Sequence, residues 1–269
     1  RVFLVDASER ILAMDAAGVL SVVSGGGRGD GPALGVPGGL TYDGTTDTLY
    51  TSAFRGPSDV VFLAVDVATG DRTLLSGDGR GDGPAPEYAR GIALGEDELG
   101  YLDYDDRLTT VALATGDRAV LSSDSVGEGP TIGDGVDVAW AAGRWLVTDR
   151  RNDTLLEVDP VSGERAVFRS GFSSPAGVAS LDEATVVVGD RELVRVDLAG
   201  GGARLAEGAP PQLGVGLVAA GAGRAYTPQS GALWSVDVAG EAFARRSEAA
   251  GAGEGFSGLS GVAGGVERG

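Results

Sequence analysis

Aspartates at the ends of short apolar segments are the residues of this chain best placed to do chemistry. The set comprises Asp6, Asp103, Asp105, Asp106, Asp149 and Asp190, and its densest part is the run Asp103-Tyr104-Asp105-Asp106. Gathered on one face, these carboxylates would attract a cation or a basic peptide. The competing interpretation is that each carboxylate accepts hydrogen bonds from the turn that follows it, which is the commoner use of such residues.

A second acidic set lies in glycine-rich segments that recur along the chain. Its members are Asp30, Asp78, Asp82, Asp124 and Glu128. Carboxylate oxygens on flexible backbone are ligands that Ca²⁺ prefers, so calcium is the metal these loops would take, although the chain requires no cofactor for the function we expect. The spacing is not that of an EF-hand, and the alternative is solvated aspartates that hydrogen-bond their own turns.

Two of these segments contain the tripeptides Arg28-Gly29-Asp30 and Arg80-Gly81-Asp82, which invite an adhesion hypothesis. The equivalent positions elsewhere read Val126-Gly127-Glu128 and Ala252-Gly253-Glu254. What repeats is therefore glycine, acid and glycine, and a loop that needs glycine for its backbone conformation explains the pattern better.

Several residue types are missing. The 269-residue chain contains no histidine, cysteine or lysine, so its 21 basic residues are all arginine. This composition excludes imidazole catalysis, a Ser-His-Asp relay, thiolate metal sites, disulfides and a cysteine nucleophile. A metal-dependent hydrolase or lactonase-like enzyme would have to rely on carboxylates in an acidic channel.

The net charge of −18 limits the partners. An acidic chain repels phosphate backbones and anionic lipid, so we expect no nucleic acid partner. No apolar run approaches the ~20 residues that a membrane helix needs, so we expect no membrane insertion. Because the first residue is Arg1 and not methionine, we expect a processed chain, secreted or extracytoplasmic, at the cell surface or in the periplasm.

The elements that must position these acids form a repeat. The segment from Val61 to Ser76 alternates, turns at Ala68-Thr69-Gly70-Asp71 and alternates again, as a β-hairpin does. Six such hairpins, marked by Asp15, Asp66, Ala112, Asp159, Asp197 and Asp237, lie about 40 to 50 residues apart, and a pair of apolar strands precedes each of the later ones. Repeats of this length with several short strands indicate a β-propeller.

The two ends of the sequence test this interpretation. Gly258 to Ala263 is a lone strand at the C-terminal end, and Val2 to Asp6 would be its partner. We therefore predict one all-β domain over residues 1–269, a six-bladed propeller with four antiparallel strands per blade, whose ring is closed by a blade shared between the terminal strands. Such pairing removes open sheet edges.

The connectors and inner strands resemble those of NHL-type six-bladed propellers. The matching pieces are Pro37-Gly38-Gly39-Leu40-Thr41, Arg90-Gly91-Ile92-Ala93, Pro175-Ala176-Gly177-Val178-Ala179 and the strand ends at Asp6, Asp149 and Asp190. The asparagine that commonly follows the strand-end aspartate in that family is lacking in most copies here, and Asn152 is the one candidate. The resemblance implies a fold that hosts scaffolds, receptors and enzymes alike.

Three functional hypotheses follow. We favour a non-catalytic binding or structural module of an exported protein, which uses loops on one face to recognise a protein or small-molecule ligand, as part of a larger surface assembly. The alternative is the metal-dependent hydrolase or lactonase-like enzyme described above. A third is self-association of the repeated loops. Tyr42, Tyr88, Tyr101 and Tyr104 would supply a binding face, and Trp140, Trp145 and Trp234 the core.

Overall fold

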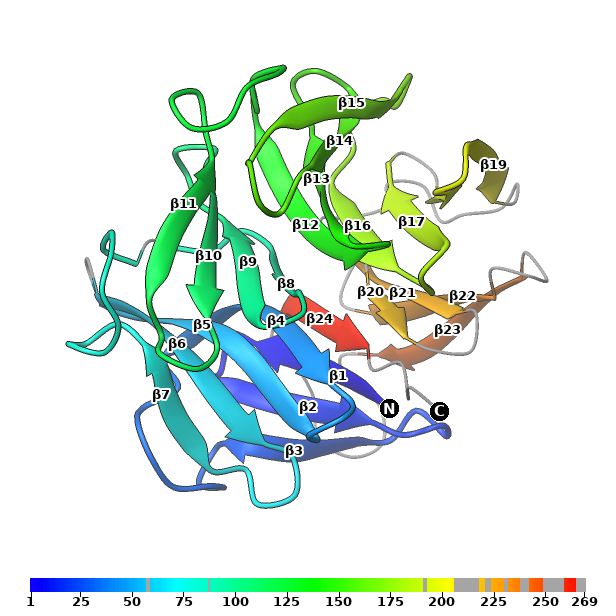
Figure 1. Ribbon diagram of the computed structural model, residues 1–269. Coiled ribbons are helices and arrows are strands. Elements are labelled where there is room, and N and C mark those ends of the chain that lie inside the picture. The colour runs from blue at the N-terminus through cyan, green and yellow to red at the C-terminus, as the bar shows by residue number, and fades with distance from the viewer. Residues whose placement is uncertain are drawn as a thin grey trace.

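The protein is an all-β propeller built from four-stranded sheets (Figure 1). This computed structural model describes residues 1–56, 59–86, 88–190, 193–205, 218–220, 224–229, 232–237, 242–248 and 259–264. Its regular elements in those ranges are strands, as the alternating segments predict. Within them we find no helix long and apolar enough to cross a bilayer.

The strands form six antiparallel sheets of four. Three sheets come from the first part of the chain: β24 (Leu259–Gly264) with β1 (Val2–Asp6), β2 (Arg10–Met14) and β3 (Leu20–Gly25); β4 (Val36–Asp43), β5 (Thr48–Gly56), β6 (Asp59–Asp66) and β7 (Arg72–Ser76); and β8 (Ile92–Leu94), β9 (Glu98–Leu102), β10 (Leu108–Ala112) and β11 (Arg118–Ser122). The other three follow: β12 (Gly135–Ala141), β13 (Arg144–Asp149), β14 (Thr154–Val158) and β15 (Arg165–Ser170); β16 (Gly177–Ser180), β17 (Thr185–Gly189), β18 (Leu193–Asp197) and β19 (Gly201–Leu205); and β20 (Val218–Ala220), β21 (Arg224–Gln229), β22 (Ala232–Asp237) and β23 (Ala242–Glu248).

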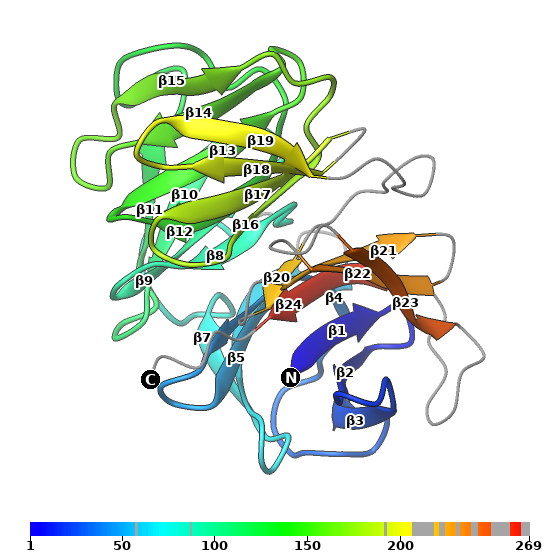
Figure 2. The same ribbon diagram turned by 90° about the vertical axis from the view of Figure 1, so that its right-hand side faces the viewer.

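The inner strands of successive sheets contact one another around a common centre (Figures 1 and 2). The contacts run from β4 to β8, β12, β16 and β20, then from β20 to β24 and from β24 back to β4. The last sheet is completed by the two ends of the chain, since β1 pairs antiparallel with β24 and Val2 lies opposite Gly264. The expected pairing of terminal strands is thus present.

The hydrophobic core is divided among the interfaces between neighbouring sheets. One cluster joins β1 and β2 to the next sheet through Phe3 and Leu63, and another joins β8–β10 to β12–β14 around Trp145. Trp145 is fully buried, as the sequence predicts, and its ring lies against Gly100, where an added Cβ would lie 2.7 Å from the ring. Neighbouring sheets therefore stabilise one another by burying faces that neither could bury alone.

Three outer strands begin with an arginine that binds the preceding connector, an arrangement we call the arginine clasp. The arginines are Arg72, Arg118 and Arg165. The Nε of each donates to a proline carbonyl at 2.6–2.7 Å, Nη1 donates to a serine hydroxyl at 2.6–2.8 Å, and the backbone N–H donates to the carbonyl of the connector's acidic residue at 2.7–2.8 Å. Each clasp ties a connector to the hairpin of the next sheet.

Glycine is required where the connector meets that hairpin. Gly29, Gly81 and Gly127 have φ between 73° and 77°, and an added Cβ would lie 1.8–2.0 Å from a carbonyl oxygen of the neighbouring hairpin. This close approach accounts for the repeated glycine, as the sequence suggests. The arginines of the two Arg-Gly-Asp tripeptides donate to backbone carbonyls, Arg28 to Val22 and Arg80 to Leu74.

Candidate functional site

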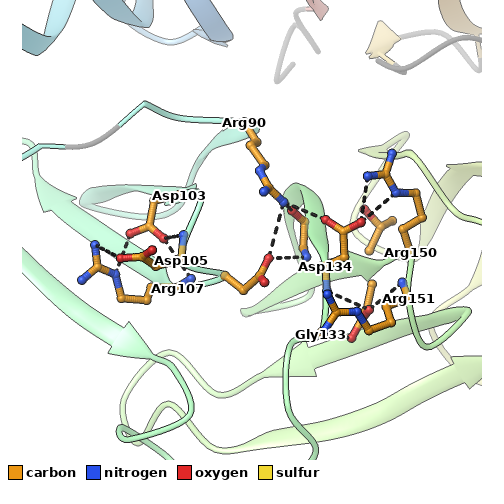
Figure 3. A network of polar contacts seen from close by, with 12 residues as sticks. Arg90, Asp103, Asp105, Arg107, Gly133, Asp134, Arg150 and Arg151 are labelled. Atoms are coloured by element: carbon orange, nitrogen blue, oxygen red, sulfur yellow. Dashed lines mark hydrogen bonds and ion pairs between the residues drawn. The ribbon is translucent and has the colours of Figure 1, made fainter. Parts of the chain in front are cut away.

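The strand-end aspartates lie at the ends of the second strands of their sheets and bind the turns that follow. Asp6 pairs with Arg10, with 2.6 Å between Oδ2 and Nη2. Asp103 accepts the backbone N–H groups of Asp105 and Arg107 at 2.9 and 3.1 Å, and its Oδ2 lies 2.8 Å from Arg107 Nε (Figure 3). Both carboxylates are buried. These contacts match the turn-stabilising interpretation.

Two other strand-end aspartates also hold the connector in front of their sheet. Asp149 Oδ2 accepts the backbone N–H of Gly133 at 2.8 Å and the side-chain amide of Asn152 at 2.7 Å. Asp190 accepts the backbone N–H of Ser173 at 2.6 Å. The six strand-end acids are thus distributed over several sheets, and all but Asp105 accept a backbone N–H group.

Asp106 belongs to an ion network with Arg90, Asp134 and Arg150 (Figure 3). Arg90 Nη1 lies 2.8 Å from Asp134 and 3.4 Å from Asp106, and Arg150 Nη2 lies 2.7 Å from Asp134. Asp106 also accepts the backbone N–H of Gly135 at 2.9 Å. The network joins the turn after β9, the connectors before β8 and β12, and the end of β13.

The pKa values of the two carboxyl groups in this network are shifted in opposite directions. Burial raises the pKa of Asp106, and the Gly135 N–H and the Arg90 guanidinium offset it only in part. Burial also acts on Asp134, but hydrogen bonds and charge from Arg150 and Arg90 outweigh it and lower its pKa. The network therefore holds Asp134 as an anion between two arginines and fixes the position of Arg90.

The proposed calcium ligands lie in three successive connectors. Asp78 lies 3.4 Å from Arg55, and Asp30, Asp82 and Glu128 use their backbone carbonyls in the arginine clasps. In the ranges that the structure describes, no three acidic side chains are grouped as a metal site would need. No contact between these side chains supports a shared calcium site.

Asp137 is a partly buried carboxyl on inner strand β12 that the sequence did not single out. Its Oδ2 accepts the backbone N–H of Val178 on β16 at 3.1 Å, and its Oδ1 accepts that of Val138 at 2.9 Å. On the other side, an added Cβ at Gly91 would lie 2.3 Å from Oδ1. The side chain therefore joins inner strands β12 and β16 and lies close to Gly91, just before β8. Burial raises its pKa to about 7, against the lowering effect of the two N–H groups.

Because of this carboxyl, we expect the free energy of unfolding to depend on pH, and the variant Asp137→Asn isolates its contribution. The folded-state pKa lies above the unfolded value of about 4, so Asp137 contributes stability that is complete below pH 4 and is lost as the pH rises to 7. Because the residue keeps some solvent exposure, the effect is smaller than the full shift implies: between pH 5 and 7 the wild type should lose roughly 1 kcal/mol relative to Asp137→Asn. Urea unfolding at each pH measures this difference. Parallel profiles for the two proteins would contradict it, and Asp124→Asn, at an exposed position, is the control.

An aromatic strip lies beside the ion network, and we define it as Val36, Phe54, Tyr88, Tyr104 and Arg90. Val36 pairs with Phe54 between β4 and β5. The rings of Phe54 and Tyr88 are 6.3 Å apart and meet edge-on, those of Tyr88 and Tyr104 are stacked at 5.5 Å, and the Arg90 guanidinium lies 4.6 Å from the Tyr104 ring centroid. Tyr104 is 60% exposed, Val36 39% and Phe54 36%. Three exposed apolar residues therefore form one continuous surface.

The sequence identified only part of this strip. Tyr88 and Tyr104 are on it as expected, whereas Tyr101 is buried in the core and Tyr42 packs against Phe3. Phe54 and Arg90 were not anticipated, because only the fold brings them next to the tyrosines. Trp234 is partly buried.

The comparisons with known proteins show the fold. No protein-family model and no curated protein matches the chain. A chain of a nidogen/laminin complex is similar in structure with a TM-score of 0.70 and 14% identity, over 97% of each chain. TolB from Acinetobacter baumannii is similar with a TM-score of 0.69 and 12% identity, over 97% of this chain and 65% of that chain. Virginiamycin B lyase from Staphylococcus aureus is similar with a TM-score of 0.60 and 12% identity, over 88% of this chain and 77% of that chain.

These neighbours are six-bladed β-propellers, so the similarity supports the propeller prediction. The narrower resemblance to NHL-type propellers has no family match behind it. The neighbours include an enzyme as well as a chain crystallised in a complex, so shared fold does not select a function.

Proposed function

We propose that this chain is a non-catalytic binding module, a six-bladed propeller that recognises its ligand through the aromatic strip. The observation that carries the proposal is the exposure of Tyr104, a large aromatic side chain that is 60% accessible and lies in line with Phe54 and Val36. Exposed aromatic residues next to arginine are typical of energetically dominant positions in protein interfaces.

Contacts with neighbouring residues hold the side chains of the strip in place before any ligand binds. Arg90 is held by Asp106 and Asp134, and Tyr88 lies over the inner strand β4, where an added Cβ at Gly38 would lie 3.8 Å from its ring. Side chains fixed in this way lose little conformational freedom when a ligand binds, so less of the interaction energy is lost on ordering.

The chemistry of the chain is consistent with binding rather than catalysis. Histidine and cysteine are absent from the whole sequence. Among the residues that the structure describes, acidic side chains do not gather in threes as a metal centre would require. Asp103, Asp106 and Asp134 are engaged with arginines or turns, which gives these carboxylates structural roles.

Replacing Tyr104 tests the proposal. We expect Tyr104→Ala to weaken ligand binding at least tenfold, a loss typical of a central aromatic contact, with little change in melting temperature because the side chain is mostly exposed. The measurement is binding of the wild type and the variant to arrays of peptides and glycans, followed by titration of each probe that binds.

Val161→Ala is the matched control. Val161 is 91% exposed in the turn between β14 and β15 and is far along the chain from the strip. Truncation of its side chain to alanine should therefore leave ligand binding unchanged. Probes that bind the wild type and Tyr104→Ala equally well would refute a role for the strip.

A further inference from the structure

We propose that the aromatic strip binds a basic peptide segment of a partner protein, with apolar side chains of the peptide against Tyr104 and an arginine or lysine in ion-pair reach of Asp105. This inference rests on the proposed function, because it names the ligand class of the same strip. Three observations carry it: the exposure of Tyr104, the exposed carboxylates of Asp105, Asp59 and Asp78, and the net charge of the chain.

The fold contains an intramolecular example of the interaction. The guanidinium of Arg90 lies 4.6 Å from the Tyr104 ring centroid and at the same time 2.8 Å from the Asp134 carboxylate. A cation between an aromatic ring and a carboxylate is attracted by both, since the ring carries negative charge on its face. Arg90 occupies this position, so a cation of a bound peptide is expected at a carboxylate that remains exposed.

A second carboxylate lies next to Tyr104 in the chain and is exposed. Asp105 follows Tyr104 directly in the turn after β9, and its side chain is 65% exposed. Its contact with Arg107 is long, with 3.6 Å between Oδ2 and Nη2, whereas Asp103 binds the same arginine at 2.8 Å. Asp105 is therefore the carboxylate near the strip that an incoming cation reaches at the lowest cost.

The opposite end of the strip has similar chemistry. Arg55, next to Phe54, pairs with Asp59 at 2.9 Å and with Asp78 at 3.4 Å, and these two carboxylates are 50% and 65% exposed. An exposed aromatic surface whose neighbouring segments carry exposed carboxylates fits a peptide in which apolar and basic residues are interspersed. The net charge of −18 would also steer such a segment toward the protein.

A carbohydrate fits this surface less well. A sugar ring packs flat on an open aromatic face, but Tyr88 and Tyr104 are stacked on each other with an interplanar angle of 24°, and Phe54 meets Tyr88 edge-on at 71°. Each of these contacts covers part of a ring. The strip therefore presents partly covered rings and an aliphatic neighbour, which suit the irregular profile of a peptide.

A peptide array with charge-neutral counterparts tests the inference. The probes are octapeptides with arginine or lysine among apolar residues, each paired with a copy in which citrulline replaces arginine and acetyl-lysine replaces lysine. We expect the wild type to bind a subset of the basic peptides at least tenfold more tightly than their neutral copies, and Tyr104→Ala to lose this binding. Asp105→Asn should weaken it several-fold, and raising the salt from 50 to 500 mM should weaken it further. Asp124→Asn, another exposed carboxylate, should bind as the wild type does.

The outcomes separate this inference from the proposed function. If neutral copies bind as well as basic peptides, or if Asp105→Asn binds unchanged, the basic-peptide inference is wrong. If only glycans or neutral peptides show binding that depends on Tyr104, the strip is still a binding site and only the ligand class is overturned. If no probe shows dependence on Tyr104, both proposals fail.

Discussion

Gly81→Ala is expected to destabilise the protein by about 3–5 kcal/mol, because the new methyl group has no space. Its Cβ would lie 1.9 Å from the carbonyl oxygen of Gly116, a main-chain atom of the neighbouring hairpin, and φ at this position is 75°. Relief requires the connector to move away from the hairpin, and this movement breaks hydrogen bonds of the clasp around Arg118, including the one to the Gly81 carbonyl at 3.1 Å.

Gly79→Ala is the matched control two residues earlier. Gly79 also has a positive φ, 83°, but an added Cβ there meets nothing within 4 Å. Its cost should be limited to the strain of a left-handed alanine, about 1 kcal/mol. Urea unfolding of both variants measures the difference, and equal losses of stability would show that backbone strain, rather than contact between connector and hairpin, explains the glycine.

Arg165→Ala should reduce the free energy of unfolding by about 3 kcal/mol, since the side chain is buried and makes several charge-assisted hydrogen bonds. Its Nε donates to the Pro130 carbonyl and its Nη1 to the Ser122 hydroxyl, both at 2.6 Å, and the Val126 carbonyl accepts a further bond at 2.9 Å. Removal of the guanidinium takes the donor from the Pro130 carbonyl and the Ser122 hydroxyl oxygen, whereas the Val126 carbonyl keeps the Ser123 N–H at 2.9 Å.

Arg165→Lys distinguishes geometry from charge. Lysine keeps the positive charge but cannot reproduce the planar set of donors, so we expect it to recover only part of the loss. Arg151→Ala, at an exposed arginine at the end of β13, should change stability by less than about 0.5 kcal/mol. A loss below about 1 kcal/mol for Arg165→Ala would mean that the clasp does not hold the sheets together.

The sequence predicted the propeller because its repeat is strong. Alternation, turn chemistry and glycine-rich connectors agree in several copies, and they also place Trp145 in the core. The clasps left a signal as well, in the related runs Thr69-Gly70-Asp71-Arg72, Thr115-Gly116-Asp117-Arg118 and Ser162-Gly163-Glu164-Arg165. The sequence did not reveal the role of the arginine in each run, because the proline carbonyl that it binds lies 34 to 40 residues away in the chain.

The candidate site could be predicted only in part, for a physical reason. Strand-end aspartates are visible in the sequence, but whether a carboxylate faces its own turn, an arginine or solvent depends on contacts between sheets. Asp137 shows this most clearly: the segment from Gly135 to Ala141 is an ordinary alternating strand, and only its place at the centre makes that carboxyl unusual. Likewise, Phe54, Tyr88 and Tyr104 become one surface only when two sheets and a connector meet.

The pairing of β1 with β24 has a mechanical consequence. The strands are antiparallel, so Val2 and Gly264 sit opposite each other at the edge where the register starts, with Phe3 and Ala263 next in line. A force that pulls residues 2 and 264 apart would break the hydrogen bonds between β1 and β24 one pair after another. It would not load all of these pairs at the same time, as shear does. Tension applied at those two residues should therefore separate β1 from β24 at low force, while the remaining sheets stay folded.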